Sequence, residues 1–174
     1  MSEIGSKTMG VKHWLAQKYV SWNTKKDLDE LETISVSVPL SPGKVKSVLI
    51  VLPRQMELVD AAVSLVHDLK KEFPAWRFMV LDMDKVLSHK LNRLDLPNNQ
   101  FIQELSDNSF DLVLDLNDGY DLRVAYLLVK LKIPYRLHLS EIPNNYYNIF
   151  VQSGDKNSQD FTYVLRYLKK IFVN

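Results

Sequence analysis

The stretch that most constrains the fold is residues 47–74, SVLIVLPRQMELVDAAVSLVHDLKKEFP. Residues 48–52 form an unbroken apolar run that is rich in β-branched side chains, a pattern typical of a strand covered on both faces of a parallel sheet. After Pro53, apolar residues return at the spacing of one helical stripe (Leu58, Ala61, Ala62, Leu65, Val66, Leu69 and Phe73). Pro74 ends this helix. The stretch therefore predicts a strand–turn–helix unit that opens an α/β domain.

The same alternation of apolar runs and helical stripes continues to the C-terminus. The further predicted strands are residues 76–81, 112–116, 134–139 and 148–151. The further predicted helices are residues 86–91, 101–105, 122–131 and 157–172, with an extended piece at 94–96 and Asp118 and Asp121 spaced to cap the third of them. Short connections imply right-handed crossovers. We therefore expect a three-layer, Rossmann-like, doubly wound and mostly parallel sheet, with residues 48–52 between 77–81 and 112–116.

Residues 1–43 predict an extra N-terminal helix, an acidic turn and an edge strand, ahead of a single Rossmann-like domain at 44–174. The edge strand is the alternating segment 34–38, and the turn contains Asp27, Asp29, Glu30 and Glu32. Within residues 4–26 there are five lysines and no acidic residue. One face of this amphipathic helix is apolar (Val11, Trp14, Leu15, Tyr19 and Trp22).

This aromatic face has two interpretations. We expect Trp14 and Trp22 to dock on the domain or on a second subunit, because tryptophans on a short helix are usually buried. The alternative is that residues 11–22 lie on an anionic membrane surface with the lysines at the flanks.

Composition excludes several classes of function. The chain has 174 residues, 46% of them apolar and 25% charged, and is therefore globular. Its net charge of +1 gives no reason to expect nucleic acid, and the absence of cysteine excludes disulfides and thiolate chemistry. The four histidines lack ligand spacing, so we expect no metal site and no cofactor. No membrane-spanning run or signal peptide is present, which predicts a cytoplasmic protein whose one candidate for contact with the inner membrane is the N-terminal helix.

Polar residues follow the predicted strands at the edge where such sheets bind ligands. The candidate rim, suited to a sugar or a phosphate, comprises Arg54, Gln55, Asp115, Asn117, Asp118 and His138. The alternative is that these residues are the ordinary solvated loops of any α/β domain. The first turn, LPRQMEL, contains no glycine, which excludes a dinucleotide fingerprint and a P-loop.

Two segments together resemble the N-terminal half of the heptosyltransferases, bacterial glycosyltransferase family nine. They are VLIVLPRQMELVDAAVSLVHDLKKEFP and FDLVLDLNDGYDLRVAYLLVKLKIPYRLHL. The shared features are the hydrophobic first strand, the helix that closes with Phe73-Pro74, and an aromatic-Asp-apolar-apolar-apolar-Asp-Leu strand from Phe110 to Leu116. The resemblance covers residues 47–139 and implies the acceptor-side Rossmann-like domain of a GT-B enzyme.

The chain departs from this family where catalysis would take place. Members carry a Gly-Asp pair in the first turn, whose Asp activates the acceptor hydroxyl, and by the family's spacing Glu57 and Leu58 stand in these places. Asn117-Asp118 replaces the usual Gln-Gly. A second domain binds the nucleotide-sugar donor in the family, and it lies outside the matched half. Only a shifted register of the turn would make Glu57 or Asp60 a candidate base.

Three hypotheses for function follow. The first is a non-catalytic glycosyltransferase-like domain used for binding or scaffolding in surface-glycan or lipopolysaccharide synthesis, with a sugar or glycolipid as its ligand. The second is an accessory or split transferase subunit that a partner chain completes. The third is an unrelated small α/β module that binds a protein partner or a second copy of itself.

Overall fold

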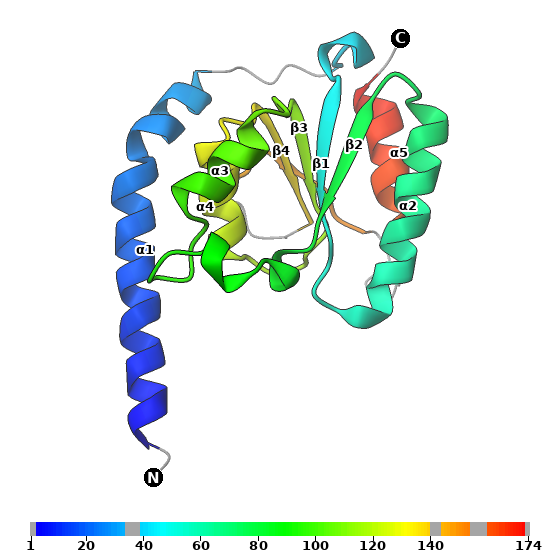
Figure 1. Cartoon of the computed structure of the whole chain (residues 1–174). Helices are drawn as coiled ribbons and strands as arrows, with labels where there is room; N and C mark the ends of the chain where they lie inside the picture. The colour runs from blue at the N-terminus through cyan, green and yellow to red at the C-terminus, as the bar shows by residue number, and fades with distance from the viewer. Residues whose placement is uncertain (1–2, 34–38, 140–143, 154–159, 173–174) are drawn as a thin grey trace.

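The computed structural model describes residues 3–33, 39–139, 144–153 and 160–172. These residues form an α/β domain around a five-stranded sheet with the strand order β2-β1-β3-β4-β5 (Figure 1). All four strand pairs are parallel, which confirms the predicted Rossmann-like, doubly wound class. The strands are β1 (Ser47–Val51), β2 (Arg77–Leu81), β3 (Leu112–Asp115), β4 (Tyr135–His138) and β5 (Ile149–Phe150).

Strand β1 is an interior strand, and helices cover both of its faces. Its side chains alternate between two cores: Val48 and Ile50 face one side and Leu49 and Val51 the other. The first core is covered by α2 (Val59–Glu72) and α5 (Thr162–Ile171), and the second by α3 (Asn99–Ser106) and α4 (Leu122–Lys130). The predicted flanking of β1 by β2 and β3 is confirmed.

Helix α1 (Glu3–Glu32) adds an outer layer that packs on α4 (Figure 1). Its buried stripe is made of small and medium side chains, Ala16, Val20 and Thr24, and the Thr24 hydroxyl is satisfied by donating to the carbonyl of Val20. Trp14 and Trp22 point the other way and are 55% and 81% exposed. The prediction that these tryptophans dock on the domain is therefore wrong. The face with the small residues packs on α4 because small side chains allow the two helix backbones to approach each other closely.

The acidic run after Lys26 is also different from the prediction. It forms the last two turns of α1 instead of a separate turn, because its carboxylates meet lysines at the end of α4. Asp27 lies 2.7 Å from the Nζ of Lys130, and Glu30 lies 2.7 Å from the Nζ of Lys132. The predicted edge strand at 34–38 lies outside the described residues.

The connection between β2 and α3 has little regular structure. The predicted helix at 86–91 is replaced by two 3-10 turns, Met83–Lys85 and Ser88–Lys90. The extended piece at 94–96 is a tight turn in which the side chain of Asn92 accepts hydrogen bonds from the backbone of Leu94 and Leu96. These are local side-chain effects that hydrophobic periodicity does not detect.

The orientation of α1 can be tested by comparing its two faces. We expect Val20→Ala to lower the free energy of unfolding by about 2 kcal/mol, because Val20 is fully buried against α4. We expect Trp22→Ala to change it by less than about 0.5 kcal/mol, because the ring is solvated. Urea unfolding followed by far-ultraviolet circular dichroism would measure both. A larger cost for Trp22→Ala than for Val20→Ala would contradict this orientation.

Candidate functional site

The candidate site lies where the strand order reverses, at the carboxyl ends of β1 and β3. Chains wound in this way leave a crevice at this point, and ligands of such sheets bind there. Two cavities of about 320 and 250 Å³ open here, and both are lined by Arg54 and Tyr120. Lys12 and His13 of α1 line the first cavity, so the extra N-terminal helix contributes a wall of the site.

Asn117 fastens the loops that form this crevice. Its Oδ1 accepts a hydrogen bond from the backbone N–H of Arg54 (3.0 Å), and its Nδ2 donates to the carbonyl of Leu52 (3.3 Å) and to Asp115 (2.8 Å). The side chain therefore ties the loop after β1 to the end of β3. Asn117 was predicted as a rim residue, and it does line the second cavity; its burial and hydrogen bonds add a positioning role.

Four charged side chains form a closed ring above Asn117. Arg54 pairs with Asp121 (2.5 Å) and Asp84 (3.5 Å), and Arg123 pairs with the same two carboxylates (3.0 and 2.6 Å). Burial lowers the pKa of Arg123, but hydrogen bonds and charges from Asp121 and Asp84 outweigh this effect and raise the pKa overall. Two arginines and two aspartates leave the ring without net charge. A phosphate at this rim would therefore meet guanidinium charges that the two carboxylates already balance.

Asp115 and His138 lie beneath the rim. They are neighbours in the β3–β4 register, both are fully buried, and Oδ2 of Asp115 is 3.7 Å from Nε2 of His138. The hydroxyl of Tyr147 donates a hydrogen bond to Asp115. Burial raises the pKa of Asp115 although Tyr147 and Asn117 donate hydrogen bonds to it, and burial also raises the pKa of Tyr147. These groups lie beneath the carboxyl edge of the sheet and do not line either cavity.

The candidate bases lie apart from this site. Glu57 is in the 3-10 turn Met56–Leu58 and Asp60 is in the first turn of α2; both are exposed, and neither lines the cavities. Leu58, in the family's position for the base, packs partly buried against the core under α2. The predicted rim residues Gln55 and Asp118 do line the second cavity.

Sequence reasoning missed several residues of the site. Asp121 had a signal, because it was expected to cap α4, and its carboxylate does accept a hydrogen bond from the N–H of Arg123 (2.9 Å). No pattern in the sequence indicated that Asp121 pairs with Arg54. Tyr147 comes from a loop 32 positions after Asp115 in the chain, and no local pattern points to it.

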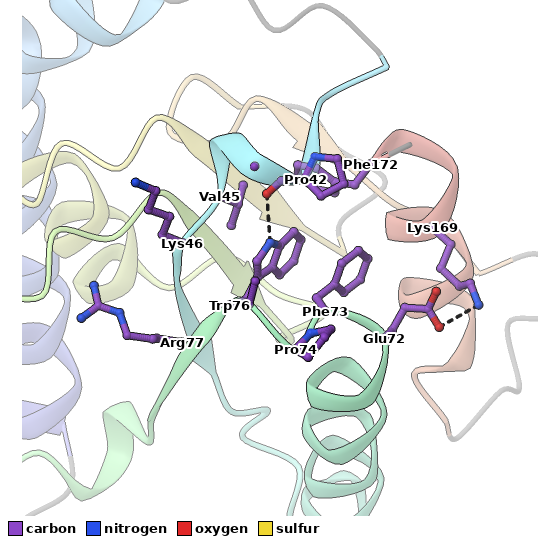
Figure 2. A pocket seen from close by; sticks show the side chains of 12 residues that line it. Pro42, Val45, Lys46, Glu72, Phe73, Pro74, Trp76, Arg77, Lys169 and Phe172 are labelled. Carbon is purple, nitrogen blue, oxygen red and sulfur yellow. Dashed lines mark hydrogen bonds and ion pairs between the residues drawn. The ribbon is translucent and has the colours of Figure 1, made fainter. Parts of the chain in front are cut away.

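A larger cavity, of about 820 Å³, lies at the opposite edge of the sheet (Figure 2). Its floor is an aromatic cluster in which Phe73 stacks on Trp76 at 4.0 Å and Phe172 meets Trp76 edge-on. The indole N–H of Trp76 donates to the carbonyl of Pro42 (3.1 Å). Lys46, Arg77 and the Lys169–Glu72 pair surround the opening. The rings are nearly buried and close the amino end of the core, which gives the Phe73-Pro74 motif a structural role.

The burial of Asp115 leads us to expect that the stability of the fold depends on pH. The raised pKa of Asp115 means that the folded state holds this proton at pH values where the unfolded chain, with an Asp pKa of about 3.9, has lost it. The stabilisation that this group contributes is therefore complete at pH values below its pKa in the unfolded chain. It decreases as pH rises toward the pKa of Asp115 in the folded state. We expect the destabilisation caused by Asp115→Asn to be greatest near pH ~4 and to shrink as pH rises.

Urea unfolding across this pH range would measure the effect. Asp118→Asn removes an exposed carboxyl from the following loop and serves as the matched control. A destabilisation by Asp115→Asn that grows with pH would show that the carboxylate, and not the carboxylic acid, is the form that the fold stabilises.

Within the described residues, no group of three or more His, Cys, Asp or Glu side chains is placed to hold a metal ion. The helices of this part of the chain also include none with the length and apolarity needed to cross a membrane. No family model, curated protein or solved structure matches this chain.

Proposed function

We propose that this chain is a non-catalytic glycosyltransferase-like domain that binds a neutral sugar at the rim between β1 and β3. The resemblance of residues 47–139 to the acceptor-side half of the heptosyltransferases supports a sugar or the sugar part of a glycolipid as the ligand. Surface-glycan or lipopolysaccharide synthesis in the cytoplasm is the setting that this resemblance suggests.

The observation that carries the proposal is the neutral ring of Arg54, Asp84, Asp121 and Arg123. Because each guanidinium already has two carboxylate partners, the positive charge of the ring is balanced before any ligand binds. Charged pairs that hold one another in place form a rigid, polar surface. Such a surface suits a ligand that is recognised by hydrogen bonds and carries no charge of its own.

The groups that line the cavities fit this ligand chemistry. Tyr120 is shared by both cavities and is 44% exposed, so part of its ring is available to the apolar face of a sugar. Gln55 and Asp118 add donors and acceptors for hydroxyl groups. The first cavity, at about 320 Å³, has the size of a small-molecule site.

The absence of transfer chemistry follows from the residues at the turn. General-base catalysis needs a proton acceptor within hydrogen-bond reach of the attacking hydroxyl. Leu58 cannot accept a proton, and Glu57 and Asp60 lie outside both cavities. A lost general base costs on the order of 100- to 10,000-fold in rate. A chain of this kind retains recognition without turnover.

The test is a titration of the purified chain, followed by backbone amide NMR shifts, with neutral hexoses and heptoses, sugar phosphates and nucleotide sugars. We expect neutral sugars to shift the amides of Arg54, Asn117 and Tyr120, and parallel assays of donor hydrolysis and sugar transfer to show no turnover. Tyr120→Ala should weaken binding roughly tenfold, because it removes the aromatic contact. Glu57→Gln, an exposed position outside the cavities, is the matched control.

Three outcomes would contradict the proposal. Turnover that is lost in Glu57→Gln or Asp60→Asn would show that the turn supplies a base. Shifts confined to Lys46 and Arg77 with phosphorylated ligands would move recognition to the cavity at the amino edge. Turnover that requires a partner chain would favour the accessory-subunit hypothesis instead.

A further inference from the structure

Helix α1 has two opposite apolar faces, and only one of them is covered. The covered face carries Ala16 and Val20 against α4. The opposite face carries four large apolar side chains in one stripe, exposed by 44 to 81%: Val11, Trp14, Leu15 and Trp22. Their spacing of three, four and seven residues places them on one line of the helix. A contiguous exposed patch with two tryptophans marks an interaction surface.

From residue 10 to residue 26 the charged side chains beside this stripe are lysines, and the exposed Asp29 follows on the same face seven residues after Trp22. Lys18 lies within the stripe and Lys25 and Lys26 follow it, and all three are exposed. From residue 10 to residue 26 the helix has no acidic side chain, and the nearest acidic residues begin at Asp27. Aromatic side chains flanked by lysines fit an interface that is apolar inside and negatively charged at its surface.

The position of α1 in the molecule allows contact with a flat surface. The helix is the outermost layer on its side of the domain, and its N-terminal half extends past the other elements (Figure 1). The stripe points away from α4, so the covered face stays packed while the stripe is engaged. No rearrangement of the domain is needed for this contact.

We propose that the stripe of Val11, Trp14, Leu15 and Trp22 binds the surface of an anionic lipid membrane, with α1 parallel to the bilayer. Indole rings favour the boundary between head groups and acyl chains, and lysine stems allow the ammonium groups to reach the anionic head groups. This surface is separate from the sugar-binding rim, so the two proposals can fail independently.

A second copy of the chain is a poorer occupant because of Lys18. The centre of the stripe lies between Leu15 and Lys18, so a symmetric antiparallel pair of helices would place Lys18 of each copy against Leu15 of the other and hold both ammonium groups inside the apolar contact. Like charges at a desolvated contact are unfavourable. On a membrane the same lysine extends to the head groups and keeps its hydration.

The experiment is co-sedimentation of the full chain with vesicles of phosphatidylglycerol mixed with phosphatidylcholine, and with vesicles of phosphatidylcholine alone. We expect binding to the anionic vesicles only, a shift of tryptophan emission to shorter wavelength, and weaker binding as salt is raised. The double variant Lys18→Gln with Lys25→Gln should lower the apparent affinity roughly 10- to 30-fold. Trp14→Ala with Trp22→Ala should also lower the affinity and should remove the emission shift.

Matched controls lie on α2 and on the 3-10 turn that precedes it, across the sheet from α1. Lys70→Gln with Lys71→Gln removes two exposed lysines, and Met56→Ala with Val63→Ala removes two apolar side chains that are 77% and 58% exposed. Both controls should bind as the parent chain does. Far-ultraviolet circular dichroism and urea unfolding confirm that each variant folds.

Three results would overturn the proposal. One is no binding to anionic vesicles. The second is binding that the stripe variants and the α2 controls reduce equally. The third is concentration-dependent self-association, without vesicle binding, that Trp14→Ala with Trp22→Ala abolishes; this would identify a second copy as the occupant.

Discussion

The parallel pairing of β1 with β3 is the interaction on which the rest of this structure depends. At each end of this pairing, a side chain from a residue next to β3 forms hydrogen bonds with the backbone next to or within β1. At the amino end the carboxylate of Asp111 accepts hydrogen bonds from the backbone N–H groups of Lys46 and Ser47 (2.7 and 3.0 Å). At the carboxyl end Asn117 ties the backbone of Leu52 and Arg54 to the end of β3. Since a slip of one residue would turn each buried side chain to the opposite face, these two clamps preserve both cores.

The same pairing determines what the carboxyl edge can do. It places the loops after β1 and β3 side by side, so that Arg54 meets Asp121 and the ring closes through Arg123 and Asp84. Charges that a transferase would direct at its substrate are here directed at one another. The Asp-Leu strand and the Phe-Pro helix end that resemble the heptosyltransferases keep structural roles, since Asp115 is buried beneath the rim and Phe73 stacks on Trp76. This distribution of charge and burial is the basis for the proposal of recognition without catalysis.

Helix α1 links the rim to the outer surface of the molecule. One side of the helix contributes Lys12 and His13 to the wall of the rim cavity, another packs on α4, and a third carries the exposed tryptophan stripe. The helix is anchored at its C-terminal end by the pairs of Asp27 with Lys130 and of Glu30 with Lys132. Because a helix is only about 10–12 Å across with its side chains, a surface bound by the stripe lies close to the rim.

Hydrophobic periodicity alone predicted the class of fold, the strands, the place of β1 between β2 and β3, and the helices from α2 to α5, because strands and helices each have a characteristic spacing of apolar residues. The role of Asp121 as the cap of α4 could likewise be predicted from the neighbouring residues. Tertiary structure alone decided which face of α1 is buried, since both faces are apolar. Ala16 and Val20 fit against α4 because their small side chains let the two helix backbones come close. Tertiary structure also decided that Asp115, Asn117 and His138 are buried and that Arg54 is neutralised, because their partners are distant in the chain: Asp121 lies 67 positions from Arg54 and Tyr147 lies 32 from Asp115. Contacts of this kind leave no period in the sequence, and only the folded sheet brings them together.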